Sequence, residues 1–489
     1  MRTTVRKIIF ASATLTSSLA LVPLSAVAQV SPAVQVSQDR LATLPAFVDG
    51  LLAQQLISRE VAGATVTVVH DGKILFTRGY GWQDVARRIP MDPARTLIRP
   101  GSVSKLVTWT ALMQLVEQGK VDLDADVNSY LDFKIPDREG QKILVRHLLD
   151  HRPGFEDRGG ITVEDPKSYL PLREWMRSNI PNRVRPSGVE TAYSNYGSAL
   201  AGYIVERVSG RPFESYVQAN IFRPLGMTRS TFLDPSGALL NDRAQGYKFE
   251  NGRFVQQPME YYQNIAPAGS IFATSNDMAR FMLAHLNDGA YGARILKPAT
   301  ARLMRESRSS NTPGLPGFAA GMFVFRETGP RLVGHGGNTT DFHSQLVLAP
   351  EAGLGFFVSY TGGQGSYAAR TELTNALIGR LFPVSPAPRW TGPDAGPLPV
   401  GAWRTNRRDY SKTPDPKNDV KVTRAGDHGL TIRTGTVDSF WEQVTPDSYE
   451  LVTGTPPGGP YDRVKFFTQS GEARMGFASQ PHVIYRQAQ

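Results

Sequence analysis

The sequence is most tightly constrained at residues 102–118, which read S-V-S-K-L-V-T-W-T-A-L-M-Q-L-V-E-Q. Apolar residues occupy nearly every side of the helix that this segment would form, and Gly119 is placed to end it. A helix that is apolar all round belongs in the interior of a domain. Lys105, on the first turn, is therefore expected to be buried close to Ser102.

The flanking sequence places strand patterns at both ends of a long helical stretch. A hairpin is predicted at residues 65–77, around an Asp71-Gly72 turn, and later strands at residues 321–326, 344–348 and 355–360. This order predicts an α+β domain over residues 37–382, in which the N- and C-terminal segments close an antiparallel sheet that is backed by a helical region. Helices are predicted at residues 37–56, 145–150, 197–208, 213–221, 275–286 and 367–381.

The C-terminal part of the chain differs in composition. Residues 383–399 are rich in proline and lack periodicity, so we interpret them as a linker, with a domain boundary near Pro386. Residues 400–489 are predicted to form a small β-barrel or sandwich, because short strand patterns alternate there with turns. Those strand patterns lie at residues 420–422, 430–433, 449–452, 464–467 and 482–486.

The first 28 residues have the pattern of an export signal. Arg2, Arg6 and Lys7 precede an apolar segment at residues 8–22, and Ala26-Val27-Ala28 is a small-residue cleavage site. We expect cleavage, a periplasmic or secreted protein and no stable membrane span afterwards. A retained anchor is the weaker alternative, because the segment is short and is interrupted by Ser, Thr and Pro. Cleavage would lower the formal net charge from +10 to +7.

Composition excludes several classes of protein. The chain has no cysteine, so disulfides, a thiolate nucleophile and Cys-ligated zinc are excluded. Its basic residues are scattered, so we expect no nucleic-acid partner. His147 and His151 are four residues apart, but no Glu follows in the zinc-protease arrangement, so we expect no metal. No phosphate-binding loop or dinucleotide fingerprint occurs, and we expect no cofactor.

The spacing of Ser102 and Lys105 permits nucleophilic chemistry. Positions i and i+3 share a helix face, so the lysine amine can reach the serine hydroxyl. A serine hydroxyl is a poor nucleophile until its proton is removed, and burial makes the neutral, proton-accepting form of lysine accessible. Ser-x-x-Lys also arises by chance, with the serine acting only as a helix cap. The motif alone therefore leaves both interpretations open.

Two further motifs favour the catalytic interpretation. Tyr193-Ser194-Asn195 precedes a predicted helix, and V-G-H-G-G-N at residues 333–338 enters one of the late strands. Ser-x-x-Lys, Tyr-x-Asn and His-Gly-Gly in this order and at these spacings resemble the serine penicillin-binding proteins and class C β-lactamases. L-L-D-H-R-P-G-F at residues 148–155 fits the same resemblance. The likeness spans about residues 37–381 and leaves the tail uncovered.

The resemblance implies a role for each residue. Ser102 would be the acylated nucleophile, and Lys105 and the Tyr193 phenol would share its proton; if Lys105 lowered the pKa of Tyr193, the phenol could pass that proton to the leaving group. The oxyanion hole would pair the N–H of Ser102 with that of the residue after His-Gly-Gly. His343 would support the site or fill space. The substrate-binding residues would be Asn195, His335, Gly336, Gly337 and Asn338.

The His335-Gly336-Gly337 motif departs from the Lys-Thr-Gly usual in β-lactamases. It is similar to D-aminopeptidases, D,D-peptidases and related esterases, and the D-aminopeptidases also carry β-barrel domains. We therefore expect an exported serine hydrolase that cleaves an amide or ester in a small-molecule or peptide substrate, cell-envelope peptides included. The alternatives are a β-lactamase and a non-catalytic binding or sensing module. The tail either serves the site or is a packing module that never meets substrate.

Overall fold

The computed structural model describes residues 35–306, 309–393, 399–453 and 462–488. From Val34 onward the chain forms one compact unit. The predicted export signal at residues 1–28 lies outside the described residues. Within the described ranges, no helix is long and apolar enough to cross a membrane.

An eight-stranded sheet organises the first part of the chain, and its order is β3-β2-β1-β12-β11-β10-β9-β8. The predicted closure of the sheet is confirmed, because β1 pairs antiparallel with β12 along its whole length, from Gly63↔Thr361 to His70↔Leu354. The strands are β1 Gly63–His70, β2 Lys73–Asp84, β3 Ile89–Pro90, β8 Phe318–Ala319, β9 Met322–Arg326, β10 Leu332–Asn338, β11 Phe342–Ala349 and β12 Leu354–Thr361.

Local sequence explains the hairpin that begins the sheet. Asp71 and Gly72 both have positive φ, 46° and 76°, in a two-residue turn between His70 and Lys73. Turns of this kind match the right-handed twist of the flanking strands, and Asp-Gly adopts them readily. The predicted hairpin therefore forms where the sequence placed it.

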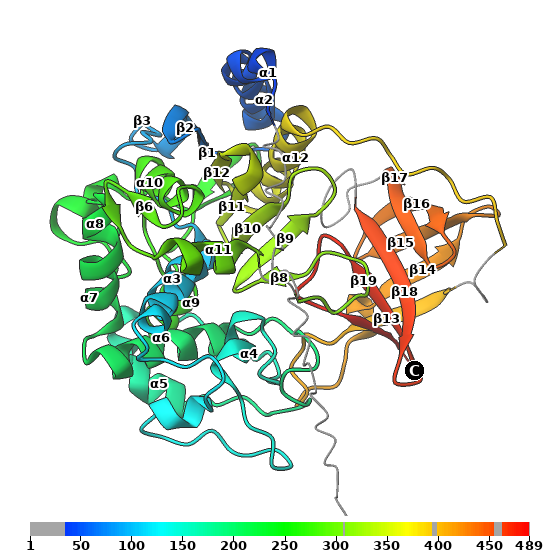
Figure 1. The fold of residues 1–489 in the computed structure, drawn as a ribbon. Helices are drawn as coiled ribbons and strands as arrows, with labels where there is room; N and C mark the ends of the chain where they lie inside the picture. The colour runs from blue at the N-terminus through cyan, green and yellow to red at the C-terminus, as the bar shows by residue number, and fades with distance from the viewer. Residues whose placement is uncertain (1–34, 307–308, 394–398, 454–461, 489) are drawn as a thin grey trace, which may run out of the picture. The chain divides into compact units, whose positions relative to one another are not determined.

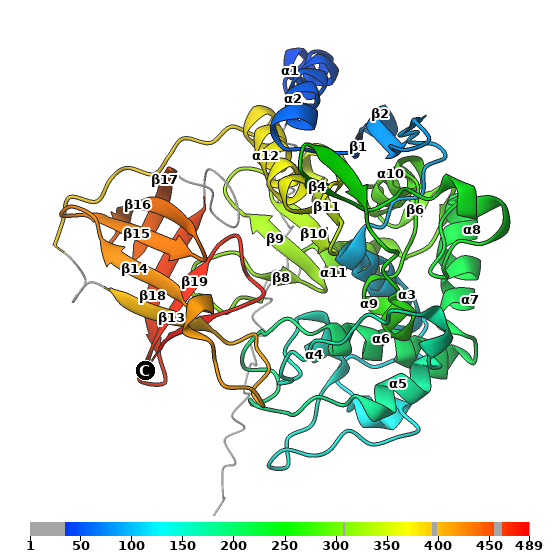
Figure 2. The same ribbon diagram turned by 180° about the vertical axis from the view of Figure 1, so that it is seen from behind.

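Helices cover both faces of this sheet. Helices α2 and α12 pack on one face; Figures 1 and 2 show α12 alongside β11, and α12 also contacts β12. Helices α3 and α10 belong to the core on the other face. The described helices are α1 Gln38–Ala42, α2 Leu44–Ser58, α3 Ser104–Glu117, α4 Val145–Leu149, α5 Leu172–Ser178, α6 Asn195–Ser209, α7 Phe213–Val217, α8 Arg223–Leu225, α9 Ala266–Gly269, α10 Ser275–Leu286, α11 Pro298–Glu306 and α12 Gly363–Leu381.

Strand β11 shows why helices pack on both faces of the sheet. Leu346 and Leu348 belong to the core that contains α3, whereas Val347 and Ala349 belong to the core that contains α2 and α12. Successive side chains of a strand point to opposite faces, so a strand that is apolar at every position is buried on both. Two further hairpins lie outside the sheet: β4 Tyr247–Glu250 with β5 Arg253–Gln256, and β6 Ala290–Tyr291 with β7 Ala293–Arg294.

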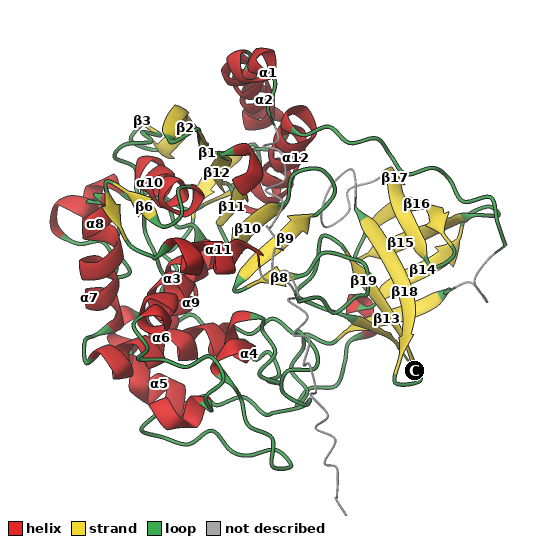
Figure 3. Ribbon diagram, viewed as in Figure 1, coloured by secondary structure: helices red, strands yellow, loops and turns green. Residues whose placement is uncertain are grey.

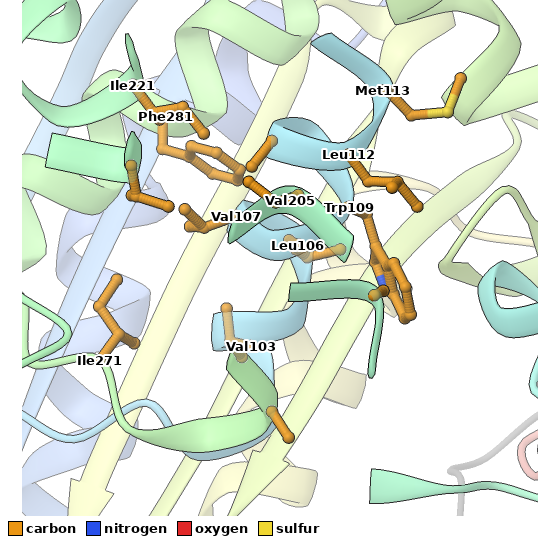
Figure 4. Packing of buried hydrophobic residues seen from close by; sticks show 14 of the residues in the cluster. Val103, Leu106, Val107, Trp109, Leu112, Met113, Val205, Ile221, Ile271 and Phe281 are labelled. Carbon is orange, nitrogen blue, oxygen red and sulfur yellow. The ribbon is translucent and has the colours of Figure 1, made fainter. Parts of the chain in front are cut away.

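Helix α3 lies inside the domain, as its composition predicts. Figure 4 shows Leu106, Val107, Trp109 and Leu112 of this helix packed among apolar side chains of other elements. The helix begins at Ser104 and not at Ser102, because Gly101–Val103 forms a short 3-10 turn in which Gly101 has a φ of +55°. That left-handed backbone, which suits glycine, leads the chain into the helix.

The tail folds into a closed eight-stranded barrel, which Figure 3 shows as yellow arrows from β13 to β20. The barrel interior is filled by side chains that include Trp403, Trp441 and Tyr449. The predicted strand patterns correspond to β14, β15, β17, β18 and β20, whereas β13, β16 and β19 were not predicted. The strands are β13 Gly401–Thr405, β14 Val420–Arg424, β15 Gly429–Thr434, β16 Val437–Thr445, β17 Ser448–Thr453, β18 Arg463–Gln469, β19 Glu472–Phe477 and β20 Tyr485–Gln487.

Candidate active site

Ser102 lies in the 3-10 turn that precedes α3, at the edge of a pocket. The turn is held by Ser104, whose Oγ donates to the Gly101 carbonyl at 2.5 Å and accepts the N–H of Ile271 at 3.3 Å. Ser102 is partly exposed, while Val103 beside it is buried. The hydroxyl is thus presented to the pocket from a backbone that is fixed on its other side.

Lys105 is completely buried and reaches Ser102. Its Nζ lies 3.0 Å from Ser102 Oγ, 2.8 Å from Asn195 Oδ1 and 2.5 Å from the Ala268 carbonyl oxygen. Burial, followed by the positive charge of Arg407, holds the pKa of Lys105 well below its usual value. A neutral amine can donate its two hydrogens to Asn195 and Ala268 and turn its lone pair to the Ser102 hydroxyl. This arrangement suits a general base.

Tyr193 is the second group beside Ser102, and its pKa is raised and not lowered. Burial is the largest influence and raises the pKa of the phenol; the interaction with Ser102 only partly offsets it, and Lys105 does not lower it. The Lys105 Nζ lies 4.9 Å from the centre of the Tyr193 ring. The condition that Lys105 lowers this pKa is therefore not met: Tyr193 is a neutral phenol here, able to relay a proton but not to start as phenolate.

Asn195 begins α6, directly after the residue that caps the helix. Ser194 Oγ accepts the N–H of Gly197 at 3.0 Å, as expected for serine at this position. Because Asn195 Oδ1 accepts from Lys105, its amide NH₂ remains a donor on a residue that lines the pocket. This orientation fits a donor to a substrate carbonyl.

One half of strand β10 has an open edge next to Ser102. β11 pairs with β10 from Val333 to Asn338, but β9 pairs only with Leu332, Val333 and Gly334. A Cβ on Gly101 would lie 3.1 Å from the Asn338 nitrogen, and one on Gly337 would lie 3.1 Å from the Ser102 nitrogen. The backbone segments that carry the two predicted oxyanion donors are therefore in direct contact.

His335 on β10 is buried and uncharged. Its Nδ1 lies 2.5 Å from the Gly336 carbonyl oxygen, which can only accept, so Nδ1 carries the hydrogen. Burial, followed by the Lys105 charge, lowers the pKa of His335 to about 3. His343 Nδ1 lies 2.9 Å from Asn338 Oδ1, so His343 contacts a residue that lines the pocket. Strand β10 thus presents a neutral ring where a Lys-Thr-Gly motif would present a cation.

Comparison with known proteins places this geometry in a family. A family model described as Beta-lactamase matches residues 48–379, more than half of the chain. The chain belongs to the β-lactamase family. The match ends just before the barrel and includes all the site residues named so far, with the exception of Arg407.

Relatives and solved structures agree with this assignment. The chain is 24% identical to protein flp of Staphylococcus aureus strain N315 over 316 residues, 64% of this chain and 62% of flp, so it spans less than two thirds of that relative. The fold is similar to that of the octameric penicillin-binding protein homologue from Pyrococcus abyssi, with a TM-score of 0.59, 22% identity and coverage of 91% of this chain and 100% of that one. It is also similar to D-amino acid amidase from Ochrobactrum anthropi SV3, with a TM-score of 0.57, 24% identity and coverage of 69% and 97%.

The pocket of this β-lactamase-family protein has a volume of about 470 Å³, within the range of small-molecule sites. It brings together Ser102, Tyr193, Asn195, His335, Gly336 and Asn338, and Gly337 lies against the Ser102 turn behind them. Sequence reasoning missed four lining residues that come from the barrel, since nothing in the strand patterns of the tail indicated where it docks. Those residues are Arg407, Ser479, Gln480 and His482.

From the sequence, His151 is a candidate metal ligand and part of the L-L-D-H motif, with no expected contact to Tyr193. The structure stacks its ring on Tyr193, with the ring centres 4.3 Å apart, and its Nδ1 accepts the N–H of Ser194 at 3.2 Å. His147 Nδ1 accepts the N–H of Leu144 at 3.2 Å. Among the described residues, no group of three or more His, Cys, Asp or Glu side chains could hold a metal ion.

Gly337→Ala tests the contact between β10 and the Ser102 turn. A Cβ at this position would lie 1.9 Å from the Pro100 carbonyl oxygen, so β10 must move away and separate the two N–H groups. We expect the rate of Ser102 acylation by an activated ester to fall about 10²-fold, as for loss of an oxyanion donor. Gly50→Ala in α2, where a Cβ meets nothing within 4 Å, is the control and should acylate normally. Equal rates in the two variants would contradict the predicted oxyanion role.

Proposed function

We propose that this serine hydrolase of the β-lactamase family is an exported peptidase or carboxylesterase that acts through a Ser102 acyl-enzyme. The observation that carries the proposal is the buried Lys105 amine, 3.0 Å from Ser102 Oγ, with a pKa held well below its usual value. Such an amine accepts the hydroxyl proton at neutral pH, which an exposed lysine does not.

The reaction then follows from the positions of the groups. Ser102 Oγ attacks the substrate carbonyl carbon as its proton passes to Lys105, and the carbonyl oxygen takes up the electron pair between the N–H groups of Ser102 and Asn338. When the C–N or C–O bond breaks, the leaving amine or alcohol receives a proton from Lys105 through Tyr193. Water then attacks the acyl carbon, loses its proton to the same base and releases the acid and Ser102.

Two observations favour an amide or ester substrate over a β-lactam. The first is the neutral His335, with a pKa of about 3, at the start of His-Gly-Gly. The second is the likeness to D-amino acid amidase, which supports hydrolysis of amino-acid or peptide amides. Peptides of the cell envelope are included in this substrate class because the first 28 residues predict export.

A labelling experiment tests the proposal on the mature chain. A fluorophosphonate should modify the purified protein once, and mass spectrometry should locate the adduct on the peptide that contains Ser102. Turnover should then be compared across p-nitrophenyl esters, D- and L-amino-acid amides and nitrocefin. Faster hydrolysis of nitrocefin than of the esters and amides would establish the β-lactamase alternative. Absence of a Ser102 adduct would establish the non-catalytic binding module.

A further inference from the structure

Two loops of the barrel reach the pocket that contains Ser102. Arg407 comes from the connection between β13 and β14, and Ser479, Gln480 and His482 come from the connection between β19 and β20. A packing module that never met substrate would not line the pocket. The loops therefore raise the question of what the barrel supplies to the reaction.

Asn406 fixes the first of these loops to the catalytic part of the chain. This side chain is almost fully buried, and its Nδ2 donates to the Thr191 carbonyl at 2.9 Å and also to Glu190 Oε1. Its backbone carbonyl accepts from Arg185 Nη2 at 2.6 Å, and its Oδ1 accepts the N–H of Ile484 at 3.1 Å. One residue thus joins both barrel loops to the segment that leads into Tyr193.

The next residue, Arg407, is placed over the proton-transfer groups. Its Cζ lies 4.7 Å from the centre of the Tyr193 ring, and its Nε donates to Asp157 Oδ2 at 2.7 Å. Asp157 is held in turn, since its N–H donates to the Arg408 carbonyl at 3.1 Å. The guanidinium is oriented from both sides and cannot swing freely into solvent.

The second barrel loop encloses the same tyrosine. The N–H of Tyr193 donates to the His482 carbonyl at 3.0 Å, and the two rings meet edge to face with centres 5.7 Å apart. The His482 ring stacks on Phe323 at 5.3 Å. Tyr193 is therefore bounded by His151 of the catalytic domain and by Arg407 and His482 of the barrel.

Among the charged groups that act on Lys105, Arg407 has the largest effect. Three histidines face the Lys105 and Tyr193 pair, and burial lowers the pKa of each: His335 and His482 to about 3, and His151 well below its usual value. All three are uncharged at neutral pH. Arg407 and Asp157 remain, and they act on Lys105 in opposite directions, the first disfavouring and the second favouring its protonated form.

We propose that Arg407 is a positioning residue through which the barrel completes the active site: it covers the Tyr193 ring and sets a positive charge at the pocket that contains Ser102. This inference rests on the proposed function of Lys105 as the base. A fixed cation nearby makes a second positive charge unfavourable, so Lys105 stays neutral at a lower pH than burial alone would allow. Acylation therefore depends on how the barrel is docked.

The test measures the rate at which a fluorophosphonate phosphonylates Ser102, as a function of pH. In that reaction the Oγ–P bond forms, the P–F bond breaks, fluoride leaves and the hydroxyl proton passes to Lys105. Arg407→Gln should raise the pKa of Lys105, so the rising limb of the profile moves to higher pH by about one pH unit and the rate at a given pH on that limb falls about 10-fold. Arg407→Lys keeps a positive charge, so its pH profile should stay close to that of wild type. Arg408→Gln is the matched control and should behave as wild type, because its side chain stacks on Tyr410 away from the pocket.

Two outcomes would overturn the inference: an unchanged pH profile in Arg407→Gln, or the same loss in Arg407→Lys as in Arg407→Gln. Arg407→Met provides a second uncharged variant if the glutamine variant folds poorly. Titration of the Lys105 side chain by NMR, assigned with Lys105→Met, reads its protonation without requiring acylation. If wild-type protein shows no Ser102 adduct but the pKa of Lys105 still rises in Arg407→Gln, the proposed function fails and this inference stands.

Discussion

Ser102→Ala is expected to abolish turnover of esters and amides, with a loss on the order of 10⁴-fold or more, the scale seen when a covalent nucleophile is removed. The Lys105 amine would then face a methyl group instead of a hydroxyl, and within the part of the chain that the structure describes no other serine oxygen lies within hydrogen-bond distance of Lys105 Nζ. The measurement is kcat/KM for a p-nitrophenyl ester, together with fluorophosphonate labelling, on the purified mature chain.

The control for Ser102→Ala is Ser178→Ala, at the exposed end of α5 and outside the pocket. This variant should turn over substrate at the wild-type rate. Because Ser102 is partly exposed and the change removes only its hydroxyl, the alanine variant should unfold close to the wild-type temperature. Residual labelling of a correctly folded Ser102→Ala protein would show that another residue is the nucleophile.

Lys105→Met is expected to lower the acylation rate by about 10²- to 10⁴-fold, the usual contribution of a positioned general base. Methionine has nearly the length of lysine without its amine, so the change removes the base and keeps the volume. The measurement is the rate at which a fluorophosphonate phosphonylates Ser102 between pH 5 and pH 10. The rising limb that Lys105 deprotonation produces in wild type should disappear, since the remaining groups near Ser102 do not lose a proton in that range.

Stability should respond differently from activity in this variant. The folded state lowers the pKa of Lys105, so between that value and the usual value near 10.4 the unfolded chain binds more protons. The buried amine therefore costs stability at neutral pH, and this cost fades as the pH rises toward 10. Lys105→Met removes the cost and loses the hydrogen bonds to Asn195 and Ala268, so the melting temperature at pH 7 should stay near or above that of wild type.

The matched control is Lys120→Met, at an exposed position just beyond the same helix, which should leave the acylation rate and its pH profile unchanged. A Lys105→Met protein that acylates at the wild-type rate would exclude Lys105 as the base. A protein that loses both activity and fold would assign Lys105 a structural role instead.

Local patterns were enough to predict most elements of the catalytic domain. The hairpin turn at Asp71 and Gly72, helix α10 and the buried strands β11 and β12 follow from turn chemistry, capping and runs of apolar residues, all of which act over a few residues. The prediction that Lys105 would be buried follows in the same way, because an all-apolar helix has only the interior to occupy.

The missing barrel strands have identifiable causes. In β16 the buried positions alternate, but two of them are the polar residues Ser439 and Gln443, so the segment lacks the apolar alternation that marks a strand. β19 begins with exposed Glu472 and Ala473, and β13 begins with Gly401 and buries only the side chain of Trp403. These segments form strands because they pair with neighbouring strands of the closed barrel. A local sequence pattern does not contain those neighbours.

By itself the sequence determined the motifs and their chemistry: a serine one turn from a lysine in an apolar helix, a tyrosine and asparagine before α6, and glycines where β10 must approach Pro100 and Ser102. Spacing along a helix or strand specifies such neighbours. Only the tertiary structure decided the electrostatics of the site, because burial and distant charges act through space. Tyr193 gained a raised pKa, His335 became neutral, and Arg407, more than three hundred residues from Ser102, came to lie over the tyrosine because Asn406 docks the barrel on the segment before it.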